Sequence, residues 1–465
     1  MNSCGFLIAL SRAIMAFVVV FSMTPFASAQ WRERVLYSFQ GIPDGAYPAG
    51  DVVFDQAGNL YGTTEYGGAN DCPGITQCGT VFQLQPPAVK GDKWKENVLY
   101  IFKGVKANDG DSPAGGILLD KAGNIYGTTA YGGSGDCKLF GSRSGCGTVF
   151  ELLPPKQEGG KWAEKVLYSF KGGKDGYFPW GDLTWDSAGN LYGATEYGGG
   201  YGSCNAPYYQ YCGTVFEVSP PKTDGGKWTE KVLYAFKSGT DGANPNGGLI
   251  FDSKGAIYGT TYYGGDTVDH CNSGDGFVGC GTVFQLTPST MNAPWTEKIL
   301  LHFKTDASMG GNPAAGVIFG PDGDLYGTTY WGGEAVSPAG TIFKLHSKAG
   351  HSWSESVLYN FTTEKADGYN PLGGLSVDNN GKLYGTTSRG GSSFYGTVFG
   401  LAPPTGHRQT WDYSVLYSFT HFPDPEMPQS SLAFDKSGNL YGTAVYGGSG
   451  NQCQGHCGAV FVLQP

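Results

Sequence analysis

The sequence predicts an all-β fold, a seven-bladed β-propeller with four antiparallel strands in each blade. Three segments, similar to GTVFQL, NLYGTTEYGG and VLYSF, each occur seven times along the chain. The 77 glycines and 26 prolines separate short runs of β-branched and aromatic residues, as expected for strands joined by turns. A single sheet with this many strands would be far larger than usual, and a β-helix, the alternative, has much shorter repeats.

Each repeat contains four expected strands, and the third copy shows their order. The strands cover residues 181–186 (GDLTWD), 190–195 (NLYGAT), 213–218 (GTVFEV) and 228–236 (WTEKVLYAF). Residues 187–189 (SAG) form a tight turn between the first two strands. We expect the repeated Tyr of YGTT and the repeated Phe of GTVF to pack between blades.

The two ends of the repeat region are complementary fragments of one blade. Residues 31–39 (WRERVLYSF) match a fourth strand, and residues 458–463 match a third strand. Pairing them closes the ring and removes two exposed sheet edges. We therefore expect a single domain over residues 30–465, with blades near residues 50–102, 115–170, 181–236, 247–303, 315–361, 373–419, and 431–463 plus 31–39.

Residues 1–29 form a separate segment that predicts secretion. Arg12 is their only charged residue, an apolar run covers residues 13–23, and Ala27-Ser28-Ala29 resembles a small-residue cleavage site. An uncleaved N-terminal anchor is the alternative, but the run is shorter than the roughly 20 residues of a spanning helix. We expect a secreted protein, extracellular or periplasmic, that is not inserted in a membrane after signal removal.

The cysteines agree with export. Apart from Cys4, ten cysteines remain, an even number that favours disulfides over a metal site because no histidine cluster accompanies them. Each bridge closes a small loop and stabilises the protein by only about 2 kcal/mol. The expected pairs are Cys72/Cys78, Cys137/Cys146, Cys204/Cys212, Cys271/Cys280 and Cys453/Cys457.

Charge excludes one class of partner. The formal net charge is −10, and no run of Lys or Arg occurs, so we expect no nucleic-acid binding. We expect a monomer whose partner is an extracellular glycan or a protein ligand.

The repeat pattern GGL-x-x-D-x-x-GNLYGTT-x-YGG, followed by GTVFxL, resembles the GloVer-type tandem repeats of secreted bacterial proteins. The resemblance covers all seven units and implies a β-propeller-like repeat with no established activity, so it transfers no catalytic residue. The D-x-x-GN-L-Y part is also similar to NHL-type and lactonase-type propellers, a similarity that bears on fold.

Propeller geometry predicts a functional face. The loops between strands two and three, and the connections from strand four to the next blade, share one face, here called the loop face. Its D-G-x-x-P connections carry aspartates at matching places, and a ring of carboxylates of this kind suits Ca²⁺. Ordinary Asp-Gly turns are the alternative, and we otherwise expect no cofactor. These aspartates are Asp44, Asp109, Asp175, Asp241 and Asp367.

Departures from the repeat point to ligand-binding residues. The residue pair after the second strand has an aromatic second member in six blades, whereas Arg389 takes this place in the sixth blade. Glu65 and Glu196 are first members, and with Arg389 they are expected to converge on a polar ligand near the channel mouth. A local salt bridge, or residues scattered over the surface, is the alternative. The pairs are Glu65-Tyr66, Ala130-Tyr131, Glu196-Tyr197, Tyr262-Tyr263, Tyr330-Trp331, Ser388-Arg389 and Val445-Tyr446.

Aromatic residues near this mouth suit sugar rings, which have apolar C–H faces and polar rims. Tyr263, Trp331 and Trp180 are the expected platforms, and packing against neighbouring loops is the alternative. The sequence contains no HExxH, no GxSxG and no phosphate-binding glycine loop. The first hypothesis is therefore a carbohydrate-binding protein. A polysaccharide lyase or glycoside hydrolase acting in the central funnel, and a protein-interaction scaffold, are the alternatives.

Overall fold

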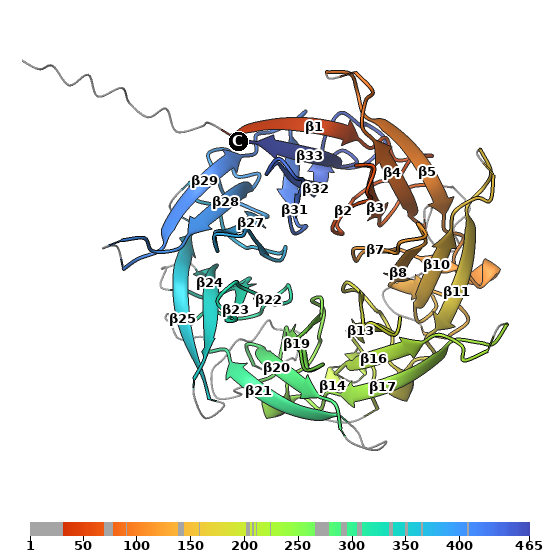
Figure 1. Cartoon of the computed structure of the whole chain (residues 1–465), viewed down its shortest axis with the longest axis horizontal. Helices are drawn as coiled ribbons and strands as arrows, with labels where there is room; N and C mark the ends of the chain where they lie inside the picture. The colour runs from red at the N-terminus through yellow and green to blue at the C-terminus, as the bar shows by residue number, and fades with distance from the viewer. Residues whose placement is uncertain are drawn as a thin grey trace, which may run out of the picture. The chain divides into compact units, whose positions relative to one another are not determined.

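The computed structural model forms a ring of seven four-stranded antiparallel sheets over the unit Trp31–Pro465, which confirms the predicted β-propeller (Figure 1). In the first blade, β2 (Val53–Phe54), β3 (Leu60–Thr64), β4 (Thr80–Gln85) and β5 (Lys95–Ile101) follow one another from the centre outwards. The structure describes residues 31–68, 78–89, 91–137, 144–157, 159–200, 205–206, 209–210, 212–223, 225–265, 279–289, 295–304, 309–333, 338–348, 352–363, 366–406 and 409–465.

The next five blades repeat this order. Three short 3-10 turns lie in the connections that follow the first, second and third blades: η1 (Val105–Ala107), η2 (Gly173–Asp175) and η3 (Gly239–Asp241). The strands are β7 (Leu118–Leu119), β8 (Ile125–Thr129), β10 (Thr148–Leu153) and β11 (Ala163–Ser169); β12 (Thr184–Trp185), β13 (Leu191–Thr195), β16 (Thr214–Ser219) and β17 (Thr229–Ala235); β18 (Ile250–Phe251), β19 (Ile257–Thr261), β20 (Thr282–Thr287) and β21 (Thr296–His302); β22 (Ile318–Phe319), β23 (Leu325–Thr329), β24 (Pro338–Ser347) and β25 (Trp353–Thr362); β26 (Ser376–Val377), β27 (Leu383–Thr387), β28 (Thr397–Ala402) and β29 (Asp412–Ser418).

The seventh blade joins the two ends of the ring. Its order is β31 (Ala433–Phe434), β32 (Leu440–Gly447), β33 (Ala459–Gln464) and β1 (Arg32–Ser38). The outer pair is antiparallel, with Arg32 opposite Gln464 and Ser38 opposite Ala459, as predicted from the split repeat. Additional short strands lie in the connections: β6 (Gly110–Asp111) pairs with β9 (Tyr131–Gly132), β14 (Asn205–Ala206) with β15 (Tyr209–Gln210), and β30 (Pro425–Pro428) with β32.

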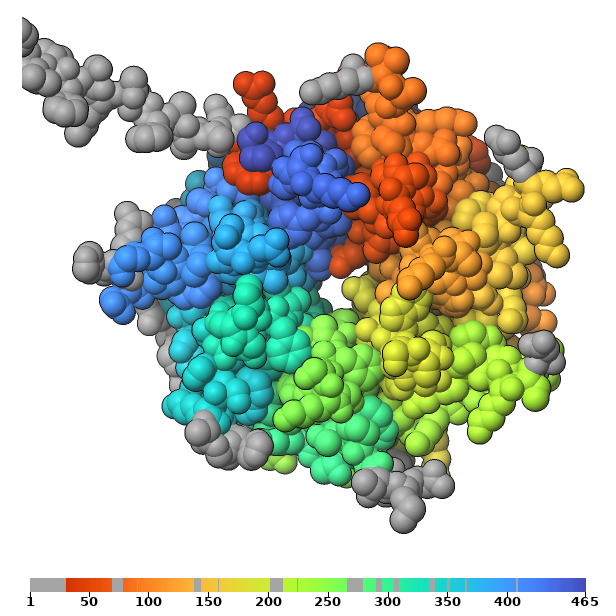
Figure 2. Space-filling view, in the orientation of Figure 1, coloured from red at the N-terminus to blue at the C-terminus, as the bar shows by residue number. Residues whose placement is uncertain are grey.

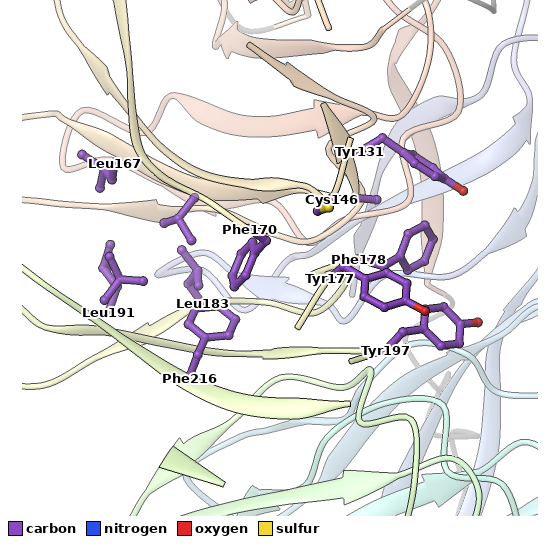
Figure 3. Close-up of a cluster of buried hydrophobic side chains, with 13 residues drawn as sticks. Tyr131, Cys146, Leu167, Phe170, Tyr177, Phe178, Leu183, Leu191, Tyr197 and Phe216 are labelled. Atoms are coloured by element: carbon purple, nitrogen blue, oxygen red, sulfur yellow. The ribbon is translucent and has the colours of Figure 1, made fainter. Parts of the chain in front are cut away.

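The core lies between the blades. The Phe of each GTVF-like segment is fully buried and contacts a second Phe, at or just after the end of the fourth strand of the preceding blade. Figure 3 shows one of these pairs, Phe170 and Phe216, whose ring centroids are 5.0 Å apart. The repeated Tyr of YGTT is also buried between blades in six units, and Tyr126 of the second blade is partly buried. Tyr61, for example, packs in one cluster with Ile117 and Phe150 of the next blade. The expected interblade packing of both residues is therefore confirmed.

Repeated hydrogen bonds stabilise each blade internally. In the first blade, Asp55 closes the turn between β2 and β3 by accepting from the Asn59 amide and from the Tyr61 hydroxyl. On the inner strands, the hydroxyl groups of Thr64 and Thr80 lie 2.8 Å apart. The seventh blade has alanines facing each other, Ala444 and Ala459, at the position of this threonine pair.

Disulfides form as predicted where the structure describes both partners. Cys137–Cys146 and Cys453–Cys457 are bonded, and Cys78, Cys212 and Cys280 are each disulfide-bonded. Their predicted partners Cys72, Cys204 and Cys271 lie outside the described residues. Within the described ranges, no helix is long and apolar enough to cross a membrane.

Candidate functional site

A channel of about 410 Å³ passes through the centre of the ring, and Figure 2 shows its opening. The residues just before the first strand line it in all seven blades, together with first-strand residues of the third to seventh blades, mostly through small side chains and backbone. Larger side chains do not fit at this position because the backbones of neighbouring blades approach each other closely. A Cβ atom at Gly50 would lie 2.5 Å from the Gly115 carbonyl oxygen, nearer than Cβ contacts normally occur.

Two carboxyl groups enter this channel, Asp51 and Asp182, and they are the ionisable side chains among its described lining residues. Asp51 Oδ1 accepts from the Ser431 amide at 2.6 Å, and Asp182 Oδ1 accepts from the Gly116 amide. Each aspartate thus joins its own blade to the preceding one. Burial raises the pKa of Asp51 to about 7, with a further contribution from the Asp182 carboxylate, and burial also raises the pKa of Asp182.

Neither aspartate is among the site residues predicted from the sequence. Asp51 and Asp182 occupy the same position in their repeats. The second, fourth, fifth and sixth blades have a glycine at this position, the second residue of Gly-Gly or Ala-Gly, and the seventh blade has Ser431. That departure from the repeat was the available signal. The signal is weak, because Gly-Asp before a strand is also an ordinary turn sequence.

The loop face carries the mouth of the channel. The two kinds of connection assigned to this face pair with each other, as in the bridge between Ala46 and Tyr66. In each blade the residue before the proline of the connection has a left-handed backbone, and its amide donates to the preceding blade, as Tyr47 donates to the Cys457 carbonyl at 2.9 Å. These residues, with φ between 55° and 64°, are Tyr47, Ser112, Phe178, Asn244, Asn312, Asn370 and Met427.

Glu196 is half-buried at this mouth. Its Oε1 accepts from the Tyr197 hydroxyl at 2.9 Å, and its carbonyl accepts from Asn244 Nδ2 at 3.1 Å. Burial raises the pKa of Glu196 to about 7, and the Tyr197 hydrogen bond only partly opposes this effect. Figure 3 shows Tyr177 and Phe178 gathered around Tyr197, the residue that follows Glu196 in the chain.

An aromatic group continues from Glu196 across the fourth and fifth blades. Tyr262 is its centre: the rings of Tyr262 and Tyr263 are 4.7 Å apart, and those of Tyr330 and Trp331 are 4.9 Å apart, both edge to face. Burial raises the pKa of Tyr262, as do Tyr263, Tyr330 and Glu196, whereas a hydrogen bond with Trp331 lowers it. Trp331 keeps 46% of its surface exposed.

Glu196, Tyr262, Tyr263, Tyr330 and Trp331 are called the mouth sector below. The structure thus brings together three predicted site residues, Glu196, Tyr263 and Trp331. Tyr262 joins them, yet it was not among the predicted residues. Tyr262 is the first member of the residue pair after the second strand, the position that Glu65 and Glu196 have in their blades. This shared position in the repeat is the sequence signal for Tyr262.

The other predicted residues lie elsewhere around the mouth. Glu65 lies beside Tyr47, whose pKa is raised by burial and by nearby Tyr446 and Glu65. Arg389 is exposed, and no ion pair joins it to Glu196 in the described part of the chain. Trp180 lines the channel, and its ring stacks on Phe178 at 5.3 Å. Convergence of Glu65, Glu196 and Arg389 on one ligand stays a prediction.

The aspartates of the D-G connections each accept a hydrogen bond from a tyrosine of the preceding strand. The Tyr37 hydroxyl and the Gln40 amide both donate to Asp44, at 2.6 and 2.9 Å, and Tyr100 and the Lys103 amide donate to Asp109 in the same way. Each aspartate therefore faces a tyrosine of its preceding strand, not the others across the ring. Among the described residues, no three His, Cys, Asp or Glu side chains gather as a metal site. The remaining members, with their tyrosines, are Asp175 with Tyr168, Asp241 with Tyr234 and Asp367 with Tyr359.

Comparison with known families decides the family. The model of the Gloeobacter/Verrucomicrobia repeat matches residues 16–270 and 269–465. The chain belongs to this repeat family. No curated protein matches it.

Solved structures similar to this family member have low sequence identity to it. The PQQ-bound aldose sugar dehydrogenase from Streptomyces coelicolor is 13% identical, with a TM-score of 0.39, over 94% of this chain and 98% of that one. The PQQ domain of pyranose dehydrogenase from Coprinopsis cinerea is 10% identical, with a TM-score of 0.42, over 94% and 95%. A polysaccharide lyase described as an ulvan lyase is 9% identical, with a TM-score of 0.48, over 92% and 95%.

Proposed function

We propose that the protein is a secreted carbohydrate-binding propeller that holds its ligand at the mouth sector. The observation that carries this proposal is the exposed Trp331 ring beside Tyr262, with the Glu196 carboxyl at the other end of the same group. A pyranose stacks its C–H face on an aromatic ring and directs its hydroxyl groups to polar side chains at the edge.

The chemistry of the sector suits a hydroxyl-rich ligand. Glu196 has a pKa of about 7, so its carboxyl group both donates and accepts hydrogen bonds in neutral solution. The tyrosine hydroxyls add donors and acceptors. Tyr197 and Asn244 hold Glu196 in place, which limits the entropy lost when a ligand binds.

Secretion is part of the same proposal. Disulfides persist in oxidising compartments, and two complete bridges lie in the described residues. The apolar segment at residues 13–23 adds a signal for export.

A glycan and polysaccharide screen tests the proposal, scored for retention and for cleavage. We expect retention without cleavage, and a loss of about tenfold or more in affinity for Trp331→Ala, because aromatic platforms dominate such contacts. Trp185→Ala is the matched control, since Trp185 is 37% exposed on β12 and belongs to neither proposed binding group. Equal affinity of wild type and Trp331→Ala would reject the mouth sector, and cleavage of a retained chain would favour the enzyme alternative.

A further inference from the structure

A second group of rings lies on the loop face across the sixth and seventh blades. It comprises Tyr395, His421, Phe422 and His456, here called the ring platform. Tyr395 and His421 stack with centroids 5.0 Å apart and planes 16° apart, and Phe422 and His456 stack at 4.3 Å and 15°. The four rings come from three successive connections of the loop face, so they form a surface between blades.

A buried carboxylate fixes the ring platform. Glu426 is 8% exposed, and its Oε1 accepts from His421 Nδ1 at 2.8 Å and from the Phe422 amide at 3.2 Å. His456 Nδ1 donates to the Gly450 carbonyl at 2.7 Å. The His421 side chain is nevertheless 68% exposed and Phe422 is 46% exposed. The rings are therefore held in place while they remain open to solvent, as a preformed binding surface requires.

Arg389 extends from the same β27–β28 connection as Tyr395. Its backbone pairs with Tyr369, and its side chain is exposed. Within the described residues the guanidinium makes no ion pair or hydrogen bond. The corresponding place in the other six blades holds Tyr or Trp, so this blade alone presents a cation there.

We propose that the ring platform and Arg389 form a second subsite that takes a carboxylated pyranose residue of a glycan chain. A planar carboxylate accepts two parallel hydrogen bonds from a guanidinium, whereas a neutral sugar does not. The sugar ring has a platform on which to stack beside this group. The inference rests on the proposed function, because it assigns an acidic sugar to the same loop face on which the mouth sector binds its glycan.

Titration calorimetry with two probes tests this subsite: polygalacturonate and its methyl-esterified form, which has the same rings without the charge. We expect wild type to bind polygalacturonate more tightly than the ester. Arg389→Gln is expected to weaken polygalacturonate binding about tenfold and to leave ester binding unchanged. Phe422→Ala is expected to weaken both. Lys121→Gln, which removes one positive charge from a turn on the opposite face, controls for net charge.

The outcomes separate this inference from the proposed function. Equal polygalacturonate affinity for wild type and Arg389→Gln overturns the subsite, as does a wild type that binds neutral glycans but no polygalacturonate. Trp331→Ala without effect on neutral glycans overturns the proposed function instead. Melting temperatures of all variants identify any loss of folding, and Arg389→Lys, which keeps the charge without the two-pronged geometry, is expected to recover only part of the affinity.

Discussion

Phe39 packs edge to face against Phe82, with ring centroids 5.0 Å apart and planes at 63°. Phe39 follows β1, the strand that the N-terminal end of the propeller adds to the seventh blade, and Phe82 lies on β4 of the first blade. The same relationship occurs at the other six interfaces, with centroid distances of 5.0 to 5.5 Å. One ring pair therefore marks each blade boundary, including the one where the chain closes.

Phe39→Ala is expected to destabilise the propeller by about 3 to 5 kcal/mol, because it leaves a cavity at a fully buried interface. Chemical denaturation monitored by fluorescence measures this change. Phe394→Ala removes the same ring from an exposed position and is expected to change the stability by less than about 0.5 kcal/mol. Equal effects of the two substitutions would contradict the closing role of Phe39.

Stability is expected to fall as the pH rises from 5 to 9. Fourth-strand glutamates lie half-buried beside connection aspartates, and burial first, then the neighbouring aspartate, raises the pKa to about 7 for Glu96 and to about 8 for Glu33. A carboxyl group with a raised pKa in the folded state favours folding below its unfolded pKa. That contribution is lost as the pH rises through the folded value. Glu164, Glu230 and Glu297 have the same kind of shift, to about 7 or 8.

A melting temperature about 5 °C higher at pH 5 than at pH 9 is the expected result. Glu96→Gln removes one titrating group but keeps its shape, so the difference between the two pH values is expected to shrink. A melting temperature independent of pH over this range would show that these carboxyl groups are not shifted.

Asp51→Asn is expected to stabilise the protein at pH 9 and to leave its stability unchanged at pH 5. The asparagine oxygen still accepts from the Ser431 amide, but the charge beside Asp182 is gone. Because the pKa of Asp51 is about 7, the wild-type group is neutral at pH 5 and charged at pH 9. Thermal unfolding at both pH values measures the effect, and a lower melting temperature at pH 9 would contradict the repulsion between the two aspartates.

The Cys453–Cys457 bridge closes a short loop against Gly41, where a Cβ would lie 3.3 Å from Cys453 Sγ. Replacing both cysteines by serine is expected to lower the free energy of unfolding by about 2 kcal/mol, mainly by releasing the unfolded chain. Denaturation of oxidised protein measures the loss. When the wild type and the double-serine variant are both reduced, their free energies of unfolding should be equal. A difference that persists after reduction would show that the loss comes from packing and not from the bridge.

The repeat predicted the ring and its closure because strand signals recur at fixed places, and because residues 31–39 supply what the last unit lacks. Contacts between units were less accessible to sequence reasoning. The same holds within one connection, where the spacing of Asp44 does not reveal that the Tyr37 hydroxyl donates to it at 2.6 Å. A calcium ring of these aspartates stays a prediction. The sequence does not single out Tyr262, because an aromatic residue in a repeat also fits the core. Its place beside Glu196 and Trp331 depends on packing across blade boundaries, which the repeat pattern does not show.

Hydrogen–deuterium exchange of the full chain, with and without a retained glycan, tests whether the mouth sector holds the glycan. We expect slower exchange in segments 261–265 and 329–333 of the loop face when the glycan is bound, with no change in the turns at 86–89 and 403–406. Protection confined to those turns, or equal exchange with and without the glycan, would contradict it.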